Sequence, residues 1–254
     1  MDVKLIAQLR DKTGAGFGDC KAALDEAGWD LDKAVEIMRK KGEAKAIKKS
    51  ERVVKEGVVA VAEGEGKIAV AALACETDFV SRGEDFQNAA KEMAEKLLSS
   101  SEEEFKAWSA PKIQELVLKI GENIQLTGQG IFSGEVIGTY IHSNKKIVGV
   151  CVLDKGSKET ASDIAMQIAA MSPRWLKPED IDAEIIDKEK EIYGEQLKSE
   201  NKPEQIWIKI IDGKLAKYYE DNCLLNQIFV KDDSKKIKDL LGDSQIVSWA
   251  KFSV

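Results

Sequence analysis

The chain has 254 residues, of which 43% are hydrophobic and 33% charged, a balance typical of a soluble globular protein. Its formal net charge is −7, its four cysteines form no CxxC pair, and no apolar run approaches the roughly 18 residues of a membrane span. These features exclude a membrane-spanning protein and disfavour a zinc site or a disulfide framework. We expect a cytoplasmic protein that needs no metal, cofactor or membrane, since Met1–Lys4 open into an amphipathic segment rather than a signal peptide.

Three short amphipathic helices are predicted first, over residues 3–12, 18–27 and 30–41. Helices of this length need to pack together, and Gly42 is expected to end the third one. The sequence therefore predicts a three-helix N-terminal domain over residues 1–43, of the size of the small ubiquitin-associated type.

A basic segment follows, with eight lysines and arginines and only two glutamates in residues 39–55. We interpret residues 44–56 as a solvated basic linker. The alternative is a segment that tracks phosphates, which would make the protein a ribosome- or RNA-binding adaptor. No aromatic residue is present there to stack on bases.

Alternating apolar residues then predict a β-hairpin, with strands near 58–61 and 67–74. A helix over 86–98, a helix over 102–124 and a short strand near Ile131 and Phe132 complete a first core half, residues 57–134.

The same pattern returns 79 residues later, with strands at 136–142 and 146–153 and a helix at 161–171. With an element at 237–241 and a strand at 246–254, these form a second core half from residues 135–178 and 222–254. The fold class is thus α+β, a two-part core with an internal repeat.

Between those segments, residues 179–221 carry apolar residues at helical spacing on both sides of Pro203. They predict an inserted antiparallel helical hairpin, which either projects as an arm or folds flat onto the core.

A large aromatic residue follows the first apolar hairpin at once. Cys75-Glu76-Thr77-Asp78-Phe79-Val80 leaves the strand Ile68–Ala74, and Thr77 and Asp78 are typical of a turn or helix cap. We therefore expect Phe79 at a surface corner, available to a partner. The alternative is that Phe79 folds back into the core.

Catalytic patterns are weak. His142 is the single histidine, and a cysteine hydrolase using Cys75 with His142 is the one nucleophilic arrangement that we consider. Gly14, Gly16 and Gly18 follow no strand, and no phosphate-binding G-x-x-x-x-G-K-[ST] loop occurs. The sequence favours a protein that acts by binding, is not an enzyme and binds no nucleotide itself.

Two long motifs resemble the signatures of the bacterial translation elongation factor Ts family, residues 9–24 and residues 75–80. Shorter matches follow in the expected order at 121–124, 163–166 and 229–235. The chain differs from the usual pattern at four positions, Gly18, Ala74, Gln167 and Ile228.

The resemblance implies a guanine-nucleotide exchange factor that binds the GTPase elongation factor Tu and promotes GDP release. It implies that Asp78 and Phe79, flanked by Thr77 and Val80, perturb the magnesium and phosphate site of the GTPase. Further partner contacts would come from two other parts of the chain. The three-helix N-terminal domain, here also called the first module, would supply Arg10, Phe17, Asp19 and Lys21, and the second core half would supply His142. The resemblance also implies a possible homodimer through the helical hairpin, with a monomer or a heterotetramer as alternatives. The given sequence ends at Val254, whereas some members of the family carry a further helical module.

Overall fold

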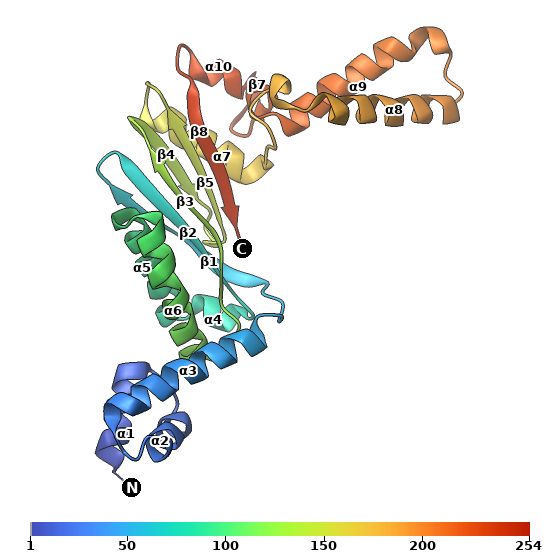
Figure 1. Cartoon of the computed structure of the whole chain (residues 1–254). Coiled ribbons are helices and arrows are strands. Elements are labelled where there is room, and N and C mark those ends of the chain that lie inside the picture. Colours follow the sequence, from blue (N-terminus) through green and yellow to red (C-terminus); the bar gives the residue numbers. More distant parts are fainter. Residues whose placement is uncertain (1) are drawn as a thin grey trace. The chain divides into compact units, whose positions relative to one another are not determined.

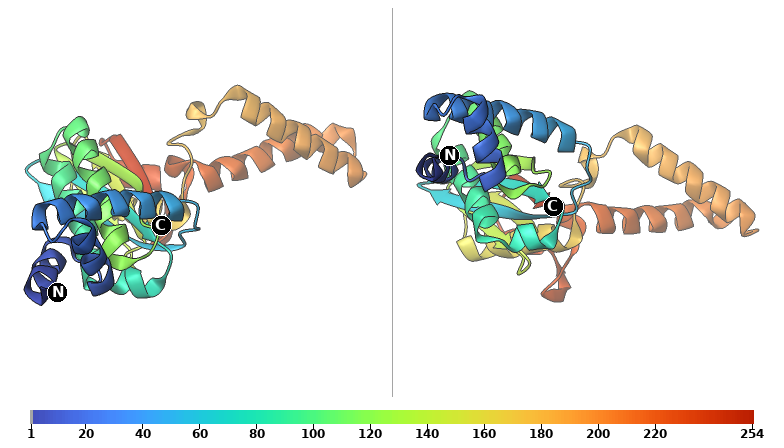
Figure 2. Two further views of the ribbon diagram at one scale, coloured as in Figure 1. Left: turned by 60° about the horizontal axis from the view of Figure 1, so that its bottom comes forward. Right: turned by 90° about the horizontal axis from the view of Figure 1, so that it is seen from below.

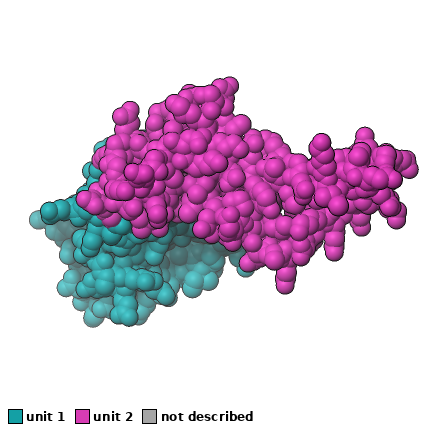
Figure 3. All heavy atoms as spheres, turned by 90° about the horizontal axis from the view of Figure 1, so that it is seen from above, with its two compact units in different colours: residues 1–133, 142–147, 252–254 teal, residues 134–141, 148–251 magenta. Residues whose placement is uncertain are grey.

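The structure, a computed structural model that describes residues 2–254, confirms a mixed α and β protein (Figure 1). The chain divides into two compact units, coloured separately in Figure 3. Unit 1 holds the residues up to Ser133 together with His142–Ile147 and Phe252–Val254, and unit 2 holds Gly134–Ile141 and Val148–Lys251. Among the described residues, no helix has the length and apolar character required to cross a membrane.

Unit 1 begins with the three predicted helices, α1 (Val3–Thr13), α2 (Phe17–Glu26) and α3 (Leu31–Lys49). Asp2 and Asp30 accept backbone N–H groups at the starts of α1 and α3, which satisfies donors that a helix leaves unpaired. The apolar faces meet in one buried cluster, to which α6 (Glu102–Ile120) also contributes. Its largest members are Ile6, Leu9, Leu24, Met38 and Leu118.

The predicted end of the third helix at Gly42 is wrong, because α3 continues to Lys49 through most of the basic segment. Gly42 is buried, and a Cβ there would lie 3.4 Å from the carbonyl oxygen of Gln114 in α6. That distance is an ordinary van der Waals contact, so α3 packs directly on α6 at this point, and the tertiary contact outweighs the low helix propensity of glycine. The helix ends where the side chains of Asn123 and Gln125 donate to the carbonyl of Ser50.

The first sheet has the order β1-β2-β3 and is antiparallel, with strands β1 (Glu56–Gly64), β2 (Lys67–Cys75) and β3 (Gln125–Ser133). Gly66 takes a left-handed conformation in the tight turn of the predicted hairpin. Every residue of β2 after Lys67 is buried. β3 is longer than the predicted short strand, and α6 ends at Ile120 rather than at 124, with Gly121 as its left-handed cap.

Helices α5 (Glu84–Ser99) and α6 pack against this sheet, as the ribbon in Figure 1 shows. The buried face of α5 recurs at helical spacing, and its largest side chain, Phe86, is only 1% exposed. A further short helix, α4 (Asp78–Arg82), lies between β2 and α5, where the sequence indicated only a turn or cap.

The second sheet has the order β4-β5-β8, with strands β4 (Val136–Ile141), β5 (Ile147–Leu153) and β8 (Ile246–Ser253). Helix α7 (Lys158–Met171) packs on it. The approach is close, because a Cβ at Gly149 of β5 would collide with the carbonyl oxygen of Ala165 in α7. A glycine at this position allows helix and strand backbones to meet.

Two longer helices in unit 2, α8 (Ala183–Ser199) and α9 (Trp207–Asn222), lie side by side in both views of Figure 2. Leu197 and Leu215 are buried, and Lys214 donates to the side-chain oxygen of Gln196 at 2.6 Å. The remaining elements are small: β6 (Ile228–Phe229), β7 (Asp232–Lys236), α10 (Ile237–Leu241), and the 3-10 turns η1 (Pro178–Asp180), η2 (Glu204–Ile206) and η3 (Leu224–Asn226).

Candidate functional site

Phe79 lies at a surface corner, as one of the two sequence-based interpretations predicted. Phe79 is 85% exposed, which is the highest exposed fraction among the large hydrophobic residues described by the structure. The alternative, burial in the core, is wrong. A single exposed apolar side chain is common on protein surfaces, so the exposure needs support from the way in which the surrounding loop is held.

Residues Glu76–Arg82, here called the 76–82 loop, comprise the two residues that follow β2 and the short helix α4. Thr77 caps α4 by accepting the N–H of Val80 at 3.5 Å, and Ser81 donates to the carbonyl of Asp78. Val80 faces inward and packs against the buried cluster that contains Phe86. Because successive helical residues point about 100° apart, a turn that packs Val80 against the core directs its neighbour Phe79 outward.

Asp78 stands beside Phe79 in the first turn of α4, where the helix dipole favours a negative charge. Its carboxylate makes an ion pair with Arg82 at 3.1 Å, one turn later in the same helix. The Arg82 side chain is 80% exposed, so this pair is weak and leaves Asp78 available to a partner.

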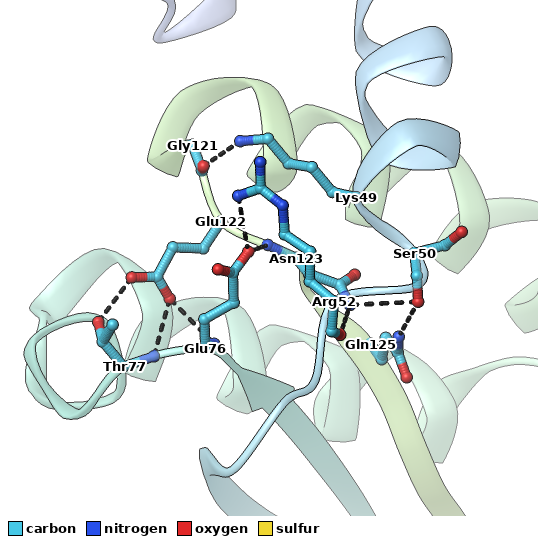
Figure 4. Close-up of polar contacts among 9 residues, drawn as sticks. All are labelled: Lys49, Ser50, Arg52, Glu76, Thr77, Gly121, Glu122, Asn123 and Gln125. Carbon is cyan, nitrogen blue, oxygen red and sulfur yellow. Dashed lines mark hydrogen bonds and ion pairs between the residues drawn. The ribbon is translucent and has the colours of Figure 1, made fainter.

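The loop is anchored from a distant part of the chain by a residue to which the sequence analysis gave no role. Glu122, just after α6, accepts the backbone N–H groups of Glu76 and Thr77, both at 3.0 Å, and the Thr77 hydroxyl at 2.6 Å (Figure 4). The signal that could have indicated it is the similarity of residues 121–124 to the family pattern, which shows that the segment matters without showing what it contacts.

A pocket of about 680 Å³ borders Phe79 within unit 1. One wall is the 76–82 loop, another is the start of β1, and a third is the turn between β4 and β5, residues 144–146. That turn is fixed beside the loop, since Lys146 pairs with Glu56 at 2.5 Å and the side chain of Lys145 donates to Gln87 at 3.0 Å.

His142 begins this same turn and is half-buried. The structure therefore brings the predicted residue His142 and the predicted loop residues into unit 1, although the sequence assigned His142 to the second core half. The backbone N–H of Asn144 lies 3.4 Å from the His142 Nδ1 atom and donates to it.

The four predicted residues of the first module lie on α1 and α2. Arg10 is exposed in the last turn of α1, and Phe17 is 48% exposed at the start of α2. Asp19 makes an ion pair with Lys45 of α3 at 3.0 Å, while Lys21 is half-buried. The contacts that hold the 76–82 loop come from other segments, so these four residues form a separate group of candidate contacts.

Cys75 does not have the environment of a nucleophile. Burial, followed by the nearby carboxylates of Glu122 and Glu56, raises the pKa of its thiol to about 12. The thiol donates to the carbonyl of Thr77 at 3.3 Å. Since the thiolate is the reactive form, a thiol held protonated at neutral pH argues against the cysteine-hydrolase hypothesis.

Half of the basic side chains in residues 39–55 have partners within the chain. Lys41 pairs with Glu26 at 2.8 Å, Lys45 with Asp19, and Arg52 with Glu76 at 3.4 Å, while Lys49 donates to the carbonyl of Gly121. These contacts fasten α3 and the segment after it to neighbouring elements. They leave fewer charges to neutralise phosphates, which weakens the RNA-binding alternative.

Comparisons with known proteins match one family, and the relatives align over nearly the whole chain. The family model described as "Elongation factor TS" matches residues 76–254. A protein of Hydrogenobaculum sp. (strain Y04AAS1) named elongation factor Ts is 42% identical, over 92% of this chain and 90% of the relative. Proteins of the same name from Aquifex aeolicus and Deinococcus deserti are 40% and 38% identical, and each alignment covers at least 91% of both chains.

Proposed function

Because this chain belongs to the elongation factor Ts family of translation elongation factors, we propose that it binds the GTPase elongation factor Tu and promotes release of GDP. The observation that supports this function is the outward position of Phe79 on a short helix whose backbone is anchored from outside the loop. The protein makes and breaks no covalent bond in this scheme, and its residues act by contact alone.

The proposed mechanism is differential binding. Phe79 enters the GTPase beside its magnesium and phosphate site, and Asp78 brings a carboxylate whose charge repels phosphate oxygens. Both contacts favour the nucleotide-free state. By linkage, a factor that binds the nucleotide-free state more tightly weakens nucleotide affinity by the same ratio.

Phe79 does not account for a large exchange effect alone. Full burial of one Phe side chain contributes about 1.5–3 kcal/mol, or about one to two powers of ten in affinity. We therefore assign the remaining affinity to the other candidate contacts. Thr77 and Val80 flank the wedge, Arg10, Phe17, Asp19 and Lys21 would bind through the first module, and His142 would meet the partner beside the loop.

The finer organisation inferred from sequence is part of the same proposal. We propose a ubiquitin-associated-like N-terminal domain, a core of two related halves, and a helical-hairpin insertion that provides a homodimer contact. We place the protein in the cytoplasm, where translation takes place, and expect that it binds no nucleotide and needs no cofactor.

A fluorescent-GDP release assay on a bacterial elongation factor Tu tests the function. The wild-type chain is expected to accelerate release, and Phe79→Ala to reduce that acceleration by about tenfold to a hundredfold, following the burial of one aromatic side chain. Circular dichroism and thermal unfolding check that the variant remains folded. If the wild-type chain leaves the release rate unchanged over a range of concentrations, the proposed function is wrong.

A further inference from the structure

The anchoring of the 76–82 loop uses nearly the whole acceptor capacity of one carboxylate. One oxygen of Glu122 accepts two successive backbone N–H groups, those of Glu76 and Thr77, and the other accepts the Thr77 hydroxyl (Figure 4). Hydrogen bonds to an ionised acceptor are stronger and shorter than neutral ones. The carboxylate thus determines the backbone position immediately before Asp78 and Phe79.

The contact is reciprocal. The backbone N–H of Asn123 donates to the carboxylate of Glu76 at 2.6 Å, so each of the two segments supplies a glutamate to the backbone of the other. Asn123 is 2% exposed, and its amide donates to the carbonyl of Arg52 at 2.7 Å. Figure 4 shows three segments that are distant in sequence joined here: the end of α3, the start of the 76–82 loop and the turn after α6.

The loop needs this external support for two physical reasons. The helix α4 has five residues, and so short a helix is not stable by itself in water. The Phe79 side chain has little packing of its own to define its position, since the residue is 85% exposed. Its direction is therefore set by the backbone before it and by the inward contact of Val80.

We infer that Glu122 is a positioning residue for nucleotide exchange, which holds the Glu76–Thr77 backbone so that Asp78 and Phe79 meet the GTPase in a preset geometry. The inference rests on the proposed exchange function. A loop that is already ordered loses little conformational entropy when it binds. A loop released from Glu122 would lose that entropy on binding, and its affinity for the partner would fall. Glu122 itself need not touch the partner.

The first measurement does not involve the partner. Hydrogen–deuterium exchange of peptides covering residues 75–83 is expected to become roughly tenfold faster in Glu122→Ala, because the amides of Glu76 and Thr77 lose their acceptor. The matched control is Glu115→Ala, which removes an exposed glutamate of α6 and is expected to leave these peptides unchanged. Unchanged exchange in Glu122→Ala would overturn the inference.

The second measurement is the maximal GDP-release rate at saturating factor. Glu122→Ala is expected to lower it by about tenfold or more, since small displacements of a positioned group cost one to two powers of ten. Glu122→Gln is expected to retain most of the rate. Its carbonyl oxygen can still accept both N–H groups, and its NH₂ can donate to the Thr77 hydroxyl oxygen.

The third measurement separates positioning from a general loss of structure. In a double-mutant cycle, Glu122→Ala added to Phe79→Ala is expected to reduce the rate little further, because the two changes disable the same element. Full multiplication of the two effects would overturn the inference. If Glu122→Ala fails to fold, Glu122→Asp replaces it in the double-mutant cycle, because it retracts the carboxylate by one methylene group. Full multiplication of its effect with that of Phe79→Ala would again overturn the inference.

The two proposals fail in different ways. If the wild-type protein does not accelerate GDP release, the proposed exchange function is wrong, and the inference about Glu122 is wrong with it. Wild-type acceleration that Glu122→Ala leaves intact overturns the role of Glu122 alone.

Discussion

The two strand-to-helix connections that follow the β-hairpins differ in what they expose. After β2, the chain forms the extra helix α4 before α5 and presents Phe79 to solvent. After β5, residues 154–157 lead directly into α7, with Ser157 as its cap and no aromatic residue. The comparison shows that a few extra residues after the first hairpin are enough to expose a large aromatic side chain, on which the proposed exchange function relies.

The two connections also differ in how their backbones are held. The second is closed by a reciprocal contact with Gln245, since the backbone N–H of Asp154 donates to the carbonyl of Gln245 at 3.1 Å and the Asp154 carboxylate accepts the N–H of Gln245 at 2.7 Å. The first depends on Glu122, which lies 45 residues away from Thr77. Both connections are therefore held by polar contacts with residues far away in the chain, and in the first the distant segment supplies a carboxylate, Glu122, to the backbone of the connection.

The largest expected effect is on the rate at which the thiols near the two connections react with a labelling reagent. Cys75 lies under the first connection and Cys151 in the strand before the second, and burial raises the pKa of each thiol to about 12. Relative to a thiol near 9, each should hold about a thousandfold less thiolate at pH 8 and react correspondingly slowly with iodoacetamide. Peptide mass spectrometry measures both rates. Rapid labelling of Cys75 in the wild type would contradict the tight closure of the first connection.

The same thiols affect stability only in alkaline solution. Their folded-state pKa values are raised above those of the unfolded chain, so the stabilisation is complete below about pH 9 and decreases as the pH rises toward 12. Denaturant unfolding at pH 8 and at pH 10.5 is expected to show lower stability at the higher pH.

Paired phenylalanine substitutions separate the exposed element from the core beneath it. Phe86→Ala is expected to lower the free energy of unfolding by about 3–5 kcal/mol, because it opens a cavity at a side chain that is 1% exposed. Phe79→Ala should change it by less than about 0.5 kcal/mol. Denaturant titrations of both variants measure the difference, and a large loss of stability in Phe79→Ala would mean that the ring has a structural role.

Removing the anchor of the second connection is expected to have a small effect on stability and none on nucleotide exchange. Asp154→Ala leaves the N–H of Gln245 without its carboxylate acceptor, but the bond is exposed and water can replace that acceptor, so the loss of stability should stay within about 0.5–1.5 kcal/mol. The maximal GDP-release rate of the folded variant should equal that of the wild type. A fall in that rate as large as in Glu122→Ala would show that the two connections are not functionally distinct.

Much of the local structure could be predicted from the sequence. Apolar spacing identified the helices of the first module, the two β-hairpins and the helices on each side of Pro203, because amphipathic periodicity is a local property. Thr77 and Asp78 after an apolar strand indicated the corner at Phe79 for the same reason, since caps and turns depend on neighbouring residues.

Features that depend on long-range contacts could not be predicted in the same way. The extension of α3 past Gly42 follows from its close packing on α6, and the full length of β3 follows from its pairing with β2. The position of residues 144–146 beside the loop and the role of Glu122 have the same origin. No local pattern in residues 121–125 shows which backbone they meet.

The sequence by itself determined the family, the mixed α and β class and the surface position of Phe79, because signatures, periodicity and capping are written in adjacent residues. Only the tertiary structure decided what holds that residue in place. Hydrogen bonds to Glu122 join residues far apart in the chain, and such pairs become neighbours only when the strands and helices between them have folded.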